Sequence, residues 1–107
     1  KIYDDADVQV PPEFPGGEDA LMNYLGAQIH YPEQAIHAEA SGRVVVGFIV
    51  NAKGEIEGVK ILRGIGHGCD EEAMRVVAAM PRWKPANNNG HAVPVYFNIP
   101  VVFEIHP

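Results

Sequence analysis

The side chains best suited to chemistry lie in one short stretch, GIGHGCDEE, which begins at residue 64. His67, Cys69 and Asp70 all carry groups that a metal ion accepts, but a closed zinc site needs four ligands at helical or CxxC spacing. Cys69 could also act as a nucleophile beside His67, because the start of a helix lowers the pKa of a thiol. A polar loop followed by a helix start, with Cys69 packed beneath it, accounts for the same residues. We therefore expect neither a metal site nor a catalytic residue here.

The rest of the chain carries no enzyme signature. GxSxG, GxxxxGK, HExxH and the glycine-rich dinucleotide motif are all absent from the sequence. Asp4, Asp5 and Asp7 could hold a cation, yet we expect them to form a solvated tail. The formal net charge of −6 argues against a nucleic-acid partner, because binding to phosphates needs a basic patch. We predict a protein that is not an enzyme, needs no cofactor and binds no nucleic acid.

The chain has the size and composition of one globular domain, with 107 residues and 47% hydrophobic content. Residues 1–17 concentrate proline, glycine and aspartate, which predicts an extended arm or the end of a linker. Residues 18–107 are predicted to form the folded domain. The single cysteine, Cys69, excludes an internal disulfide, and no apolar run approaches the roughly 18 residues of a membrane span.

Hydrophobic periodicity predicts helices and strands in an α+β order. Asp70 is the expected N-cap of the last helix, and Gly54 is expected to take a positive φ in the turn between the first two strands. The predicted elements are helices in 18–29, 32–42 and 69–80, and strands at 44–50, 56–63 and 93–103.

The order of these elements predicts the sheet. The hairpin of the first two strands, the crossover helix and the final strand form a split β-α-β unit. A right-handed crossover places the last strand beside the first. We therefore predict a three-stranded antiparallel sheet in the order 2-1-3, with the helices packed on one face and the last strand on an edge.

The prolines of the last strand indicate which side of it is open. Pro94 and Pro100 are an even number of residues apart, so the missing N–H groups lie on the same side of the strand. Proline is tolerated only where no ladder hydrogen bond is needed, which assigns this side to the edge. Tyr96, Asn98 and Val102 share that parity and are predicted to direct their N–H groups outward. The prolines remove some of the N–H groups of this edge, but the edge can still pair with another strand.

The stretch AAMPRWKPANNNGHAVPV places a lone tryptophan, Trp83, between two basic residues and two prolines. Three roles compete: core packing, a stacking platform for a ligand or nucleic acid, and a pin that fixes the start of the last strand. Stacking on nucleic acid would need more aromatic residues and more positive charge nearby. We favour a packing anchor that positions the strand. The predicted structural anchors are Tyr31, Pro32, Trp83 and Pro85.

Five stretches of the sequence form a recognisable series. They are PPEFPGGEDALMNYL, YPEQA, SGRVVVGFIVNAKGEIEGVKILRG, DEEAMRVVAAMPRWKPANNNG and VPVYFNIPVVF. Together they cover about residues 11–103 and resemble the C-terminal domain of TonB energy transducers, particularly the gut-Bacteroidetes type. Their order and spacing make the resemblance specific. Position 69, commonly leucine in that family, is cysteine here, which we interpret as a packing substitution.

The resemblance implies a periplasmic domain, joined by a linker to an inner-membrane helix that an ExbB/ExbD-like motor drives with the proton motive force. Such a domain is not an enzyme. It binds the TonB box, a short extended segment of outer-membrane receptors, by adding it as a strand to the sheet edge. The alternative is a periplasmic structural or sensor module that dimerises through the same edge. The expected partner-binding residues are Val93, Val95, Tyr96, Phe97, Asn98, Ile99, Val101 and Val102.

Overall fold

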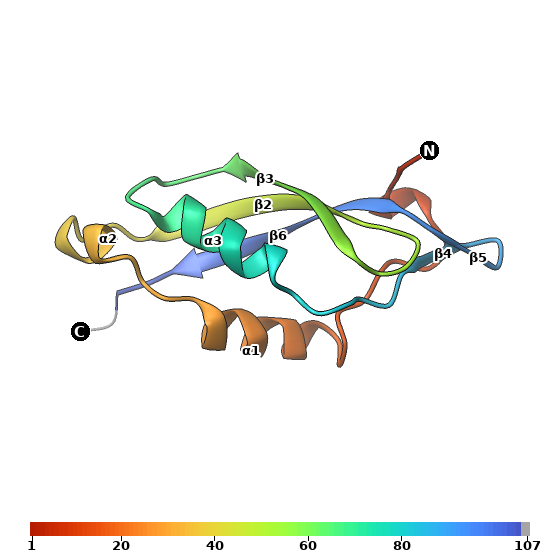
Figure 1. Cartoon of the computed structure of the whole chain (residues 1–107), viewed down its shortest axis with the longest axis horizontal. Helices are drawn as coiled ribbons and strands as arrows, with labels where there is room; N and C mark the ends of the chain where they lie inside the picture. The colour runs from red at the N-terminus through yellow and green to blue at the C-terminus, as the bar shows by residue number, and fades with distance from the viewer. Residues whose placement is uncertain (106–107) are drawn as a thin grey trace.

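The computed structural model describes residues 1–105 and forms a sheet with helices on one face (Figure 1). The order of the secondary-structure elements follows the prediction for the long elements and adds short ones. In chain order they are β1 (Tyr3–Asp4), the 3₁₀ helix η1 (Asp5–Asp7), α1 (Glu18–Gln28), α2 (Glu33–His37), β2 (Gly42–Val50), β3 (Ile56–Arg63), α3 (Cys69–Ala78), β4 (Ala86–Asn88), β5 (His91–Val93) and β6 (Val95–Phe103).

The main sheet has four strands in the order β1-β6-β2-β3. The antiparallel part, β3-β2-β6, is the predicted 2-1-3 order, and the α+β class is confirmed. The fourth strand corrects the prediction of a three-stranded sheet, because β1 pairs in parallel with the start of β6, Tyr3 opposite Val95 and Asp4 opposite Tyr96. A two-residue strand leaves no periodic pattern in the sequence, so only the folded chain shows it.

The core lies on one face of the sheet. Alternate residues of β2, from Val44 to Val50, are at most 2% exposed, and they stand beside the inward-facing residues of β6. Helix α3 packs on β2 and β3, while α1 runs beside β6 (Figure 1). On the opposite face Leu62, Tyr96 and Val102 are about half exposed. The helices thus cover one face, as predicted.

The predicted last strand, residues 93–103, is interrupted at Pro94. Val93 belongs to β5 and pairs with Ala86 of β4, in a separate two-stranded sheet. Asn89 and Gly90 form the turn of this hairpin with positive φ values of 54° and 81°, as a type I′ turn requires. Pro94 has no N–H group and ends β5. The prediction of Val93 as part of the edge strand is therefore wrong.

The start of α3 also differs from the prediction. Helix α3 begins at Cys69, and its N-cap is Gly68, which has a left-handed φ of 83°. The Asp70 carboxylate instead accepts hydrogen bonds from the backbone N–H groups of Ile65 and Gly66, at 2.9 Å and 3.2 Å. The prediction of Asp70 as N-cap is therefore wrong. Cys69 is fully buried, and this burial raises the pKa of its thiol, as do the nearby acidic groups of α3.

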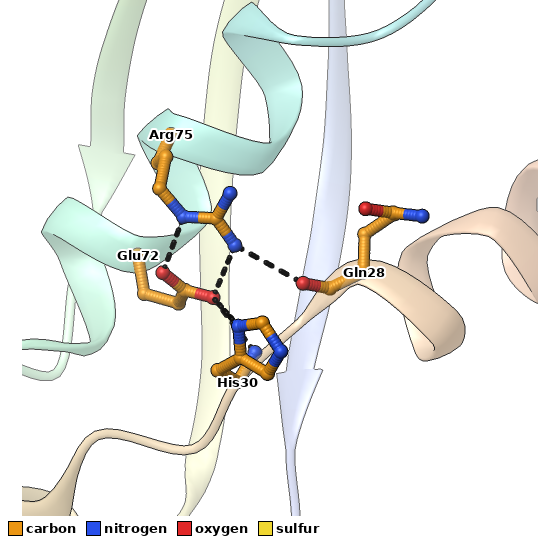
Figure 2. Close-up of polar contacts among 4 residues, drawn as sticks. All are labelled: Gln28, His30, Glu72 and Arg75. Atoms are coloured by element: carbon orange, nitrogen blue, oxygen red, sulfur yellow. Dashed lines mark hydrogen bonds and ion pairs between the residues drawn. The ribbon is translucent and has the colours of Figure 1, made fainter.

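A polar network holds the segment after α1 to α3 (Figure 2). The Glu72 carboxylate accepts hydrogen bonds from Arg75 Nε at 2.8 Å and from the backbone N–H of His30 at 2.7 Å. Arg75 also donates to the backbone carbonyl of Gln28 at 3.1 Å. The hydrogen bond from Arg75 is the main cause that lowers the pKa of Glu72. The network fixes the C-terminal end of α1, the helix that runs beside β6.

We expect Glu72→Gln to lower the free energy of unfolding by about 1–2 kcal/mol at neutral pH, because the substitution removes the ion pair with Arg75 and leaves one acceptor oxygen for donors that now use both carboxylate oxygens. The folded-state pKa of Glu72 lies below its unfolded value. Its contribution is therefore present above the unfolded pKa and lost as the pH falls through the folded pKa. Urea unfolding at about pH 7 and about pH 3 should show the gap between wild type and variant narrowing in acid. Glu71→Gln, at an exposed position of the same helix, is the control, and equal losses in both variants would contradict the role of the network.

Candidate partner-binding edge

The strand β6 has an inner side, the edge toward β2, that is paired along its whole length. Its outer side, the opposite edge, is mostly unpaired. Nine residue pairs join β6 to β2, from Gly42 opposite Phe103 to Val50 opposite Val95. On the outer side, β1 pairs only with Val95 and Tyr96. Within the described residues, no strand pairs with the outer side of residues 97–103. We call this stretch the free edge.

The hydrogen bond between β1 and β6 shows which backbone groups face outward. The Tyr3 N–H donates to the Pro94 carbonyl at 3.0 Å, so the polar groups of Pro94 face away from β2. Because backbone direction alternates along a strand, residues of the same parity also face outward. The backbone N–H of Tyr96 faces β1, so it is not open to a partner while β1 is in place. The residues that face outward along the free edge are Asn98, Pro100 and Val102, and Pro100 offers only its carbonyl.

Two hollows lie along the free edge on the helix side, and Met22 of α1 lines both. We call them the arm hollow and the Tyr31 hollow. The arm hollow, of about 570 Å³, lies between α1, Asp5 and residues 11–14 of the arm, and the stretch of β6 around Asn98. The Tyr31 hollow, of about 310 Å³, lies between α1, Tyr31 and the end of β6. A strand added to the free edge would pass beside both.

The side chains of the predicted partner-binding residues face two ways. Val95, Ile99 and Val101 are at most 3% exposed and pack in the core, and Phe97 is partly buried beside them. Their side chains hold β6 in the core, so at these positions only the backbone of β6 could contact a partner. Tyr96 and Val102 are 46% and 49% exposed, and Asn98 is also exposed. Whether these residues bind a partner stays a prediction.

Trp83 is buried at 3% exposure, so its ring offers no open stacking platform. It makes edge-on contacts with Phe14, Phe48 and Phe97, with ring centroids 5.5–5.7 Å apart. Its backbone N–H donates to the Gly54 carbonyl at 2.8 Å. The residue therefore connects the arm, the β2–β3 hairpin and β6. This is the position expected of a packing anchor.

The other predicted anchors are Tyr31, Pro32 and Pro85. The Tyr31 hydroxyl donates to the Ala40 carbonyl, and its ring contacts Phe103 edge-on, with centroids 5.6 Å apart. Burial of the hydroxyl, together with the nearby Cys69, raises the pKa of Tyr31. Pro32 precedes α2 as its N-cap, and Pro85 is half-buried just before β4. Their role as anchors stays a prediction.

The docking of the arm on the domain leaves little signal in the sequence. Two antiparallel bridges hold it, between Val10 and Asn87 and between Glu13 and Lys84, and each has backbone hydrogen bonds in both directions. Phe14, only 6% exposed, packs against the Trp83 ring. The apolar residues among the prolines were the available signal. The division of the chain at residue 17 stays a prediction, although residues 3–14 of the arm contact the domain.

Two features bear on other kinds of site. In residues 1–105, no three His, Cys, Asp or Glu side chains gather where they could hold a metal ion. The helices of this part of the chain are too short or too polar to cross a membrane.

Known proteins resemble both the sequence and the fold. The sequence profile of the family described as Gram-negative bacterial TonB protein C-terminal matches residues 27–105. The fold is similar to the NMR solution structure of the Helicobacter pylori TonB C-terminal domain, with a TM-score of 0.59 at 18% identity, over 80% of this chain and 90% of that one. No curated protein matches the chain. Because the matched residues make up well over half of its length, the chain belongs to the family of Gram-negative TonB C-terminal domains.

Proposed function

We propose that this domain is the receptor-binding end of a TonB-type energy transducer and binds the TonB box of outer-membrane receptors by strand addition to β6. The free edge carries the proposal, because strand addition needs an unpaired row of N–H and C=O groups beside pockets for alternate side chains. Asn98 and Val102 supply donors and acceptors, and Pro100 supplies an acceptor. The two hollows supply the pockets.

The sheet is suited to a contact under tension. The inner side of β6 is tied to β2 along its whole length, from Val95 to Phe103. Hydrogen bonds that a partner strand makes along the outer side would share a load directed along the strand. The pull would pass through β6 to β2 and the core rather than to a flexible loop.

The family membership supports the wider role. We propose that the domain lies in the periplasm and that the full-length protein is anchored in the inner membrane, where an ExbB/ExbD-like motor drives it with the proton motive force. The quoted sequence stretches favour the Bacteroidetes type. In this role the domain needs no cofactor and catalyses no reaction. An apolar anchor followed by a proline-rich linker upstream of this domain would support the transducer role.

Removing the two outward donors of the free edge should weaken partner binding by about five- to 150-fold, because each lost hydrogen bond costs about 0.5–1.5 kcal/mol. The double variant Asn98→Pro/Val102→Pro removes both donors and follows the parity of Pro100, so the ladder to β2 keeps its bonds. Titration of the domain with TonB-box peptides from the same organism, followed by the backbone amides, gives the affinity. The matched control Asn98→Ala/Val102→Ala loses the side chains, keeps the donors and should bind within about threefold of wild type.

Three outcomes would contradict the proposal. If the peptide shifts the backbone amide signals of other residues but not those of residues 97–103, the binding site lies elsewhere. Self-association through β6 in a sedimentation concentration series, without peptide binding, would favour the dimerising module instead. Equal affinities of the proline and alanine variants would mean that the backbone of the free edge does not carry binding.

A further inference from the structure

The arm hollow has an acidic rim. The charged residues that line it are Asp5, Glu13 and Glu18, and no lysine or arginine lines it. They come from three separate segments: η1, the bridge to Lys84, and the first turn of α1. None of the three takes part in an ion pair among the described residues. The rim therefore carries negative charge that no ion pair among the described residues neutralises.

The floor of the same hollow is apolar. Pro12, Phe14, Leu21 and Trp83 line it and are all buried, and Met22 adds a half-exposed thioether side chain. An apolar floor with an acidic rim fits a side chain that has an aliphatic stem and a positively charged end. Lysine and arginine are the side chains with this form.

The hollow lies where a side chain of an added strand would reach it. Asn98 and Pro100, both on the free edge, line it as well. Side chains of a strand alternate between the two faces of a sheet, so every second residue of the added strand faces the helix side. The next such residue lies about 6.6 Å further along. Toward the end of β6 it would face the Tyr31 hollow, which Leu25, Ile29 and Phe103 line with apolar surface.

Resting on the proposed strand addition, we propose that the partner segment carries a lysine or arginine opposite the stretch Asn98–Pro100 and an apolar side chain two residues away. The basic side chain lies along the floor of the arm hollow, and its charge meets the three carboxylates of the rim. The apolar side chain fills the Tyr31 hollow. The edge would thus select among extended segments by charge, which backbone pairing alone cannot do.

Three peptides that differ in one residue test the proposal. They are acetylated and amidated, alternate valine and threonine in the order Val-Thr-Val-Thr-X-Thr-Val-Thr-Val, and carry lysine, glutamine or glutamate at X. We expect the lysine peptide to bind the 107-residue domain about tenfold more tightly than the glutamate peptide, with glutamine between them. The preference should shrink when the salt concentration rises from about 0.05 M to about 0.5 M, because exposed charges are then screened.

Matched variants separate the rim from the overall charge. Glu13→Gln/Glu18→Gln should reduce the preference for lysine to about threefold or less, since two of the three carboxylates are gone. Glu33→Gln/Glu71→Gln removes the same charge from exposed positions outside the hollow and should leave the preference unchanged. Equal binding of the lysine and glutamate peptides, or equal effects of the two double variants, would overturn the inference. These results test only the selection by charge. Strand addition itself, and with it the proposed function, fails if TonB-box peptides leave the amides of residues 97–103 unshifted.

Discussion

Replacing Trp83 with alanine is expected to lower the free energy of unfolding by about 3–5 kcal/mol, the range for deleting a large buried aromatic side chain. The ring is 3% exposed and contacts three other aromatic rings, from the arm, β2 and β6. Its removal would leave a cavity at the point where these three elements meet. The surrounding residues cannot close that cavity easily, because β2 and β6 are fixed to each other along nine residue pairs.

Urea unfolding followed by circular dichroism measures this loss, since the variant has no tryptophan to report by fluorescence. Trp83→Phe is the matched control. It keeps an aromatic ring in the cluster and should retain a good part of the lost stability. The indole Nε1 is buried without a hydrogen-bond partner among the described residues, so no buried bond is broken in either variant. A loss below about 1 kcal/mol for Trp83→Ala would show that the residue is not a packing anchor.

The anchor should also matter for the free edge, because Phe97 is one of the rings that Trp83 supports. Phe97 lies at the start of the free edge, next to Tyr96, where β1 stops pairing. A loosened Phe97 would let the edge strand move just where a partner begins to pair.

The long elements of the fold could be predicted because their residues alternate strictly. Val44, Val46, Phe48 and Val50 set the inner face of β2, and this pattern, with the crossover rule, was sufficient for the order of three strands. The short elements could not be predicted. The strand β1 has two residues, and β4 consists of Ala-Asn-Asn, which has no strand pattern at all. Their pairing depends on a docked arm and on a turn that tertiary contacts select.

The open side of β6 followed from Pro94 and Pro100, because a proline reports directly on where hydrogen bonds are missing. The same reasoning could not show that another segment of the chain, β1, would pair with the backbone of Tyr96. That pairing joins residues more than ninety positions apart, and nothing near Tyr3 in the sequence marks it. The acidic rim was equally hidden, since Asp5, Glu13 and Glu18 line one hollow only when the arm docks against β4 and β6.

Gly54→Ala is expected to lower the free energy of unfolding by about 2–4 kcal/mol, through a strained φ and a steric clash. Gly54 has the positive φ that the sequence predicts, at 83°, and a Cβ atom there would lie 1.9 Å from the carbonyl oxygen of Trp83. The Trp83 N–H donates to the Gly54 carbonyl, so the two segments cannot separate without breaking this hydrogen bond. The hydrogen bond from the Gly54 N–H to the Asn51 carbonyl holds the turn itself in shape.

Gly90→Ala isolates the clash from the backbone strain. Gly90 has nearly the same φ, 81°, but open space where a Cβ atom would lie, so its substitution should cost only the strain, about 1 kcal/mol. Urea unfolding of both variants gives the difference, and equal losses would mean that the contact between Gly54 and Trp83 is not tight. If Gly54→Ala is the more destabilised, the β2–β3 turn and the Trp83 segment are locked together. The start of β6 pairs with the end of β2 next to this turn, so the turn then helps to position the start of β6 in addition to the ladder between the two strands.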